Sequence, residues 1–217
     1  FDVVIAEDVK TALDLERYDL VLLPNTAFID KAFCDAIAEY ASKGGRVLAT
    51  GEVGLGDSQG FSRNDFALGP LFGITRKGSI EGHFAMDGPK EPEPATGVFQ
   101  QVDAPEGEVI LRHWDTDPSG PVAGGPDPLP MMTTAWPVAI KRKVGKGQVL
   151  YIAFGIGRYY AQSTLVHARD RMAACIDLLL SERQIYVTAP RYLEVTVWRQ
   201  ETPERTIIHL ANRTPLA

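Results

Sequence analysis

The chain of 217 residues is 45% hydrophobic and 23% charged, the average make-up of a globular protein, which excludes a wholly disordered, collagen-like or disulfide-dense chain. Its formal net charge of -6 argues against a nucleic-acid partner, because phosphate binding needs a concentrated basic surface. We find no apolar run long enough to cross a membrane and no signal peptide. A membrane partner is therefore not expected, and the compartment stays open, with the cytoplasm favoured.

The first fifty residues alternate predicted strands and helices with short connections. The predicted elements are a strand at 1–5, a helix at 9–17 capped by Asp8, a buried strand at 18–25, a helix at 30–43 and a buried strand at 46–50. Strands and helices in this order favour right-handed βαβ crossovers and hence a parallel sheet. The expected fold class is α/β with a flavodoxin-like parallel sheet.

The rest of the chain is richer in predicted strands. The predicted elements are a short helix at 66–72, a β-rich insertion at 76–130 with strands near 97–102 and 108–114, a hairpin of 139–144 with 148–154, a helix at 165–181, and strands at 192–198 and 206–210. Two strands alone make a marginal unit. We therefore assign residues 1–184 to an α/β domain and residues 185–217 to the beginning of an antiparallel β domain.

Residues that bind metals or attack substrates are sparse. Cys34 and Cys175 lie in apolar helical patterns, which predicts two small buried hydrophobic side chains. The four histidines have no metal-ligand spacing, so no metal and no cofactor is expected. The group 113–117 is the most suggestive around a histidine, and we interpret it as solvated loop residues beside an anchored Trp114. The basic run at 141–146 is interpreted as a solvated hairpin end.

The Gly-rich segment 51–57 follows a predicted parallel strand at its carboxyl end, where open α/β sheets place ligand sites. Glu52 stands where acyl-transfer enzymes carry a nucleophile, but a carboxylate cannot replace a thiolate in attacking an amide. We favour a structural role for Glu52 and disfavour a glycosidase pair of Glu52 with Asp57. If the segment binds a ligand, the predicted residues are Glu52, Asp57, Arg158 and Tyr160, although core packing of the tyrosines is the favoured alternative.

Four segments carry a resemblance to a known family: 18–25, 40–50, 65–74 and 145–151. On these segments the chain resembles the class I glutamine amidotransferase-like superfamily and, more narrowly, the beta-galactosidase trimerisation domain of multidomain glycoside hydrolases. Active amidotransferases carry a cysteine at the elbow and a His-x-Glu pair after a later strand. Here Glu52, Gly155 and Gly157 stand at those positions. The resemblance therefore implies a domain without catalytic residues.

The resemblance also implies what surrounds this domain. It implies a non-catalytic accessory or oligomerisation domain of a carbohydrate-active protein, forming a homo-oligomer such as a trimer, with a TIM-barrel glycosidase domain upstream in the same parent chain. Residues 192–212 are similar to the small antiparallel domain that follows in such proteins. The alternative is a module that binds a sugar or another small molecule at the carboxyl ends of the strands.

Overall fold

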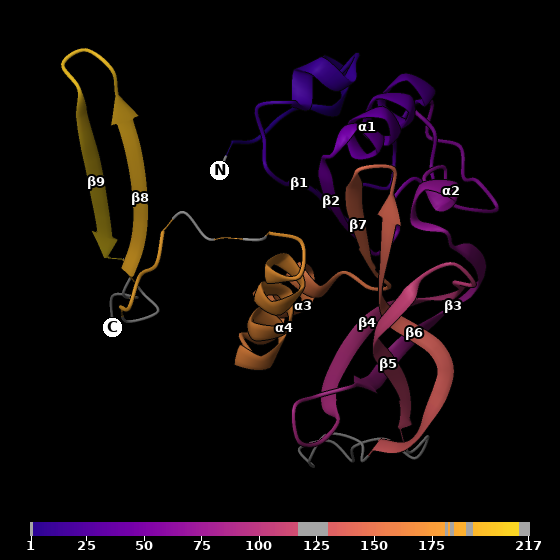
Figure 1. Cartoon of the computed structure of the whole chain (residues 1–217). Helices are drawn as coiled ribbons and strands as arrows, with labels where there is room; N and C mark the ends of the chain where they lie inside the picture. Colours follow the sequence, from indigo (N-terminus) through magenta and orange to yellow (C-terminus); the bar gives the residue numbers. More distant parts are fainter. Residues whose placement is uncertain (1, 117–129, 181, 183–184, 190–192, 213–217) are drawn as a thin grey trace. The chain divides into compact units, whose positions relative to one another are not determined.

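The computed structural model describes residues 2–116, 130–180, 182, 185–189 and 193–212 (Figure 1). It forms two compact units, Phe1–Ser181 and Glu182–Ala217. The helices are η1 (Ala6–Asp8), η2 (Ala12–Leu15), α1 (Lys31–Lys43), α2 (Gly69–Phe72), α3 (Ile156–Ser163) and α4 (Val166–Asp177). The strands are β1 (Val21–Pro24), β2 (Arg46–Thr50), β3 (Thr75–Met86), β4 (Glu93–Asp103), β5 (Glu108–Thr116), β6 (Pro130–Val144), β7 (Gly147–Ile152), β8 (Leu193–Gln200) and β9 (Arg205–Asn212).

The first unit is a mixed α/β structure on a seven-stranded sheet with the order β1-β2-β7-β6-β5-β3-β4. β1, β2 and β7 run parallel, with Val21 opposite Val47 and Val47 opposite Val149. Helix α1 packs against β2 and β7 and buries an apolar face that includes Ile37 (Figure 1). At its ends, Asp30 Oδ1 accepts a hydrogen bond from Phe33 N and Gly44 terminates the helix at φ 127°.

The predicted β-rich insertion forms the antiparallel half of the same sheet. The strand islands expected near 97–102 and 108–114 lie in β4 and β5, while β3, which pairs with β4 along most of its length, was not predicted. The predicted hairpin is confirmed as β6 and β7. The interpretation of its basic residues as solvated is wrong for Arg142, because Arg142 Nη1 donates to the carbonyls of Pro70 (2.7 Å) and Leu71 (3.1 Å). Arg142 also pairs with Glu106 and so fastens α2 to β6.

Two predictions for the amino-terminal residues are wrong. Residues 2–5 form no strand in the structure, and Val3 is 86% exposed. The helix expected at 9–17 is replaced by η1 and η2, with Asp8 inside η1 rather than capping a helix. The chain is extended at Thr11, whose backbone N–H donates to Asp14 Oδ2 at 2.8 Å and so begins a new turn there.

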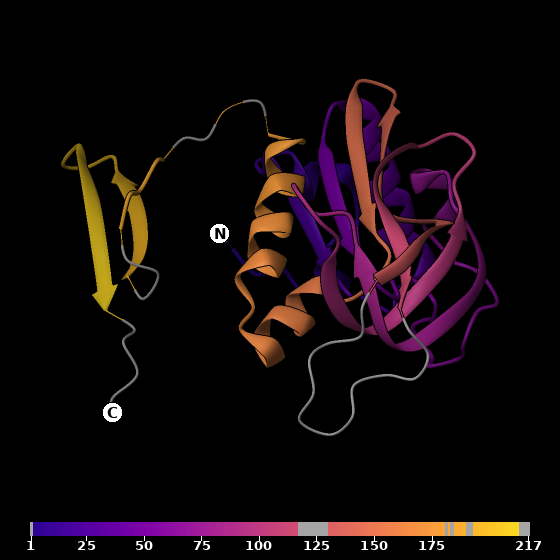
Figure 2. The same cartoon turned by 90° about the horizontal axis from the view of Figure 1, so that it is seen from below.

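The end of the first unit also differs from expectation. The helix predicted at 165–181 is α4, which ends at Asp177, and the separate helix α3 precedes it. Helix α3 was not predicted because Gly155 and Gly157 lie at its start, and glycine has a low helix propensity. Both helices lie beside the β3–β4 hairpin (Figure 2). None of the described helices is both long enough and apolar enough to span a membrane.

The second unit contains the antiparallel pair β8 and β9, at the predicted positions. Val195 lies opposite Leu210 and Val197 opposite Ile208, so these four apolar side chains share one face of the pair. Ile208 and Leu210 are 61% and 64% exposed. Within the described residues this unit therefore has an apolar face without a covering layer.

Candidate functional site

The carboxyl ends of β1, β2 and β7 meet at a junction built by Asn25, Gly51 and Gly155. Asn25 has a positive φ of 52° and joins the ends of β1 and β2, because its N–H donates to Thr50 Oγ1 (3.0 Å) and its Oδ1 accepts from Glu52 N (2.9 Å). A Cβ atom added to Gly51 would lie 2.0 Å from Asn25 Oδ1 and 3.4 Å from Gly155 N. The close packing is confined to Gly51, because a Cβ atom on Gly155 would lie 3.7 Å from its nearest neighbour and one on Gly157 would meet nothing within 4 Å.

Two hydrogen bonds to residues of β7 also hold the turn at Gly51. Gly51 has φ 61°, its N–H donates to the Ile152 carbonyl (2.8 Å), and its carbonyl accepts from the hydroxyl of Tyr151 (2.7 Å). Tyr151 is fully buried, and this burial raises the pKa of its phenol well above the ordinary value. The positive φ of the turn falls on Gly51 and not on Glu52, so the backbone does not present Glu52 on a strained elbow.

The Gly-rich segment after Gly51 is a small, ordered platform rather than a loose loop. Residues 26–29, 54–57 and 61–63 pair through bridges of Gly56 with Phe28 and with Ser62. The Arg63 guanidinium donates to the carbonyls of Ile29 (3.0 Å), Gly54 (3.2 Å) and Gly56. This platform presents two aromatic rings to solvent, since Phe28 is 61% and Phe61 67% exposed. We call it the aromatic platform.

The four predicted ligand-binding residues have separate surroundings in the structure. The Asp57 carboxylate accepts from Gln59 N and Phe61 N, each at 2.9 Å, and so closes its own turn. Arg158 and Tyr160 are exposed on α3, and Glu52 is half-buried. No hydrogen bond or ion pair joins any two of Glu52, Asp57, Arg158 and Tyr160, all of which lie in the described part of the chain. A ligand site built from them stays a prediction.

A polar cluster between α4, α3 and β4 was missed by the sequence analysis. His167 Nε2 donates to the Pro94 carbonyl (2.7 Å), and the Tyr159 hydroxyl donates to the same oxygen (2.9 Å). Arg171 Nε lies 3.0 Å from Glu93 Oε2, and their side chains are only 20% and 16% exposed. The spacing of His167, Arg171 and Cys175 was an available signal, because residues four apart share one face of a helix.

The prediction of a buried side chain is confirmed for Cys175, whereas Cys34 is only partly buried. Cys175 is buried, and this burial raises the pKa of its thiol to about 11. Burial also raises the pKa of Cys34. Both thiols therefore stay protonated near neutral pH, where a nucleophile or metal ligand needs the thiolate.

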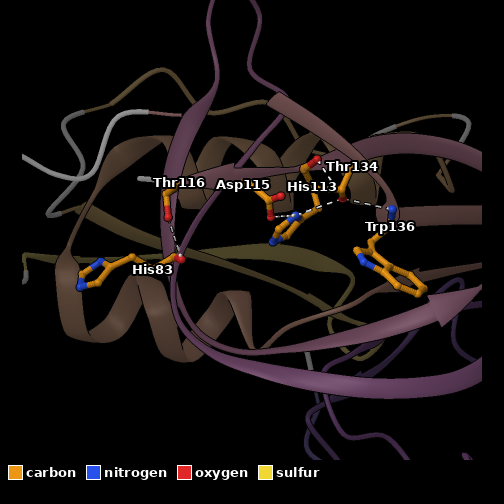
Figure 3. Close-up of polar contacts among 6 residues, drawn as sticks. All are labelled: His83, His113, Asp115, Thr116, Thr134 and Trp136. Carbon is orange, nitrogen blue, oxygen red and sulfur yellow. Dashed lines mark hydrogen bonds and ion pairs between the residues drawn. The ribbon is translucent and has the colours of Figure 1, made fainter. Parts of the chain in front are cut away.

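His113 is a buried polar side chain of the antiparallel half (Figure 3). The interpretation of this residue as part of a solvated loop is wrong: it lies in β5, is 2% exposed, and contacts the rings of Phe84 (5.4 Å between centroids) and Phe99 (4.5 Å). The anchoring of Trp114 is confirmed, since its Nε1 donates to Asp87 Oδ1 at 2.8 Å. Asp117 lies outside the described residues.

Thr134 provides the polar contacts around the His113 ring. Thr134 Oγ1 donates to the His113 carbonyl (3.4 Å), accepts from Trp136 N (3.2 Å) and lies 3.1 Å from His113 Nδ1 (Figure 3). The Thr134 hydroxyl is thus the polar partner of the His113 ring at Nδ1. Desolvation lowers the pKa of His113, partly offset by Asp115, whose Oδ1 lies 3.9 Å from Nδ1.

His113 does not form a metal centre in this arrangement. The ring of His83 points away from it (Figure 3), and the contact in that region is a hydrogen bond from Thr116 Oγ1 to the His83 carbonyl (3.2 Å). Within the described residues, no group of three or more His, Cys, Asp or Glu side chains is arranged to hold a metal ion.

The lowered pKa of His113 predicts a pH-dependent stability. The unfolded chain binds the proton near the ordinary pKa of 6.5, whereas the folded chain binds it at lower pH. The free energy of unfolding should therefore be highest above about pH 6.5 and fall as the pH drops towards the folded pKa. Urea unfolding of wild type and His113→Phe between neutral and mildly acidic pH measures this effect, and the variant should show the shallower slope. Equal slopes would rule out His113 as the source.

Comparison with known proteins gives one family and several structures. Residues 3–86 match the family model described as beta-galactosidase trimerisation domain. No curated protein sequence matches the chain. Among solved structures, alpha-L-fucosidase isoenzyme 2 from Paenibacillus thiaminolyticus is similar over 100% of this chain and 32% of its own, with 19% identity and a TM-score of 0.75.

Two beta-galactosidases are also similar in structure. The GH42 enzyme Gan42B from G. stearothermophilus aligns with 93% of this chain and 27% of its own at 15% identity and a TM-score of 0.67. The enzyme from Rahnella sp. R3 aligns with 92% of this chain and 28% of its own at 18% identity and a TM-score of 0.64. The chain thus spans about a third or less of the length of these relatives. Residues 3–86 match the beta-galactosidase trimerisation domain, and the chain has the fold of the corresponding part of these larger enzymes.

Proposed function

We propose that this chain is a non-catalytic accessory part of a carbohydrate-active, beta-galactosidase-like protein and that it mediates self-association. The observation that carries this proposal is the match of residues 3–86 to a trimerisation domain. The structural relatives support it, because three enzymes that cleave sugars contain the same fold beside a much longer remainder of chain.

The junction after β2 supports the non-catalytic part of the proposal. Gly155 offers no side chain, Gly51 is enclosed by Asn25, and the Glu52 backbone amide is held by the same asparagine. Neither thiol is available as a thiolate near neutral pH, since burial raises the pKa of both Cys34 and Cys175. A glutaminase reaction that uses a cysteine thiolate is therefore not expected at this junction.

The proposal extends to the origin of the fold and to the parent protein. We place the parallel part, β1, β2 and β7 with α1, in the class I amidotransferase-like superfamily with its flavodoxin-like sheet, an assignment supported by the β-α-β connection from β1 through α1 to β2. We also infer a TIM-barrel glycosidase domain upstream in the parent chain. Its support is the share of 27% to 32% that the matching region occupies in the three relatives.

Self-association is the directly testable element. Sedimentation equilibrium of the purified chain over the micromolar range should give a mass that rises with concentration towards that of a trimer. Added monosaccharides should leave this mass unchanged if assembly and sugar binding are separate. A chain that stays monomeric at every concentration would contradict the proposed function.

A further inference from the structure

A half-buried arginine and a buried glutamine contact each other on the neighbouring strands β3 and β4. Arg76 Nε donates to Gln100 Oε1 at 3.1 Å, while Arg76 Nη2 makes only a long contact of 3.4 Å with Ser79 Oγ. A guanidinium has donors and no acceptor, so the carbonyl oxygen of the Gln100 side chain must face it. Gln100 is 1% exposed, and its Nε2 has no hydrogen-bond partner among the described residues. A buried donor without a partner is unfavourable, and a ligand oxygen would satisfy it.

The pair lies at the carboxyl end of β7, the edge at which open α/β sheets bind ligands. Gln100 N donates to the carbonyl of Ala153, the residue that follows β7, at 2.7 Å. Burial is the main cause of the raised pKa of Tyr151, and the charge of Arg76 opposes this rise whereas that of Glu52 adds to it. The guanidinium of Arg76 and the carboxylate of Glu52 therefore both lie near the Tyr151 hydroxyl.

Glu52 supplies an acceptor beside these donors. Its backbone N–H donates to Asn25 Oδ1 at 2.9 Å, whereas its half-buried carboxylate makes no hydrogen bond or ion pair with another described residue. The carbonyl of the preceding Gly51 accepts from the Tyr151 hydroxyl at 2.7 Å, which fixes the backbone that carries Glu52. Within the described chain, the carboxyl ends of β2 and β7 are thus accompanied by an unpaired carboxylate, a guanidinium and an unpaired amide donor.

The charges of this group favour a neutral, hydroxylated ligand. Glu52 would repel an anion and Arg76 would repel a cation, whereas a sugar hydroxyl can both donate and accept a hydrogen bond. One hydroxyl can therefore donate to Glu52 while its neighbour accepts from Arg76. We propose that Glu52, Arg76 and Gln100 bind a saccharide unit through such a pair of adjacent hydroxyls. The Arg76 side chain turns away from its weak contact with Ser79, and this movement gives a ligand oxygen access to Gln100 Nε2.

Sugar binding at this site does not require self-association and so goes beyond the proposed function. The site shares only Glu52 with the ligand-binding residues predicted from the sequence. Of the others, Asp57 already accepts two hydrogen bonds within its own turn, and Arg158 and Tyr160 are exposed on α3. The two sets therefore make different predictions about which variants lose the ligand.

NMR titration of the purified chain with D-galactose and with L-fucose tests the site. We expect a dissociation constant on the order of 1 mM, because a single sugar unit has few atoms with which to gain binding free energy. The side-chain amide signal of Gln100, identified by its loss in Gln100→Leu, should shift during the titration. Acetate, an anion that could pair with Arg76 alone, should not displace the sugar. Displacement by acetate would assign the site to anions and overturn the ligand class.

Variants test the three side chains separately. Arg76→Met and Glu52→Gln remove one charge each while keeping most of the side-chain shape, and Gln100→Leu removes the amide. Each should weaken sugar binding by about tenfold or more, because each removes a hydrogen bond that involves a charged or buried group. Glu81→Gln on β3 and Arg158→Met on α3 are the matched controls, since both residues are exposed, and they should bind like wild type. Circular dichroism melting checks that each variant is folded, and the two half-buried positions carry the test if Gln100→Leu does not fold.

Three results would overturn this inference. They are a wild-type chain that binds neither sugar, site variants that bind like wild type, and loss of binding in Arg158→Met but not in Arg76→Met. Each of them leaves self-association as it stands. A chain that binds galactose through these residues yet stays monomeric at every concentration would overturn the proposed function alone.

Discussion

Replacing Gly51 with alanine is expected to lower the free energy of unfolding by about 3 kcal/mol. Two penalties combine at this position. Gly51 has φ 61°, a conformation that alanine adopts only with strain, and the new Cβ atom would lie 2.0 Å from Asn25 Oδ1. Asn25 cannot yield without loss, because the same oxygen accepts the hydrogen bond from Glu52 N. Urea unfolding measures the change.

A matched glycine separates the two penalties. Gly60 also has a positive φ, 89°, but a Cβ atom there meets nothing within 4 Å. Gly60→Ala should therefore cost only the backbone strain of about 1 kcal/mol. The double variant Gly51→Ala/Asn25→Gly should recover part of the loss, because glycine removes the obstructing oxygen and tolerates the φ of 52° at position 25. If Gly51→Ala costs no more than Gly60→Ala, the close packing of this junction is refuted.

Arg171→Ala is expected to lower the free energy of unfolding by about 2–3 kcal/mol. Arg171 Nε lies 3.0 Å from Glu93 Oε2, yet neither atom makes a hydrogen bond of normal geometry, so the pair is held mainly by charge. Removing the guanidinium leaves a largely buried carboxylate without its partner, which costs more than a surface ion pair is worth. The partial exposure of both side chains keeps the loss below that of a fully buried pair.

Arg169 on the same helix provides the control. It pairs with Asp170 at 2.6 Å, but their side chains are 40% and 49% exposed. Arg169→Ala should change the free energy of unfolding by less than about 0.5 kcal/mol. Replacing both members of the inner pair, in Glu93→Leu/Arg171→Met, should restore much of the stability lost in Arg171→Ala, because no unpaired charge remains. Thermal unfolding of wild type and the three variants measures these changes. Equal losses of stability in Arg171→Ala and Arg169→Ala would disprove the role of burial.

The buried parallel strands could be predicted because each is a short apolar run of consecutive residues. Val47, Leu48 and Ala49 form a short apolar run and are fully buried in β2. The helix predicted at 30–43 is α1, whose ends at Asp30 and Gly44 depend on a few neighbouring residues. For β3 the local signal failed, because most of its residues before Phe84 are polar, glycine or partly exposed and its pairing partners come from later in the chain.

In the candidate site, too, features set by neighbouring residues could be predicted and features set by the fold could not. The sequence allowed a prediction about catalysis only through the resemblance, from which residues stand at Glu52, Gly155 and Gly157. The aromatic platform could not be predicted from the sequence. Arg63 donates hydrogen bonds to the carbonyls of Ile29 and Gly54, which are close together only in the folded chain. The enclosure of His113 likewise depends on Phe84 and Phe99, which come from two other strands.

The long strand β6 has a consequence for how the first unit unfolds. It pairs with β5 on one side and with β7 on the other. The backbone of β6 therefore links the antiparallel half to the parallel half. Deleting the antiparallel half would leave β7 with an exposed, aggregation-prone edge. The two halves should therefore melt in one cooperative transition, and their protected amides should share one free energy of opening in hydrogen exchange.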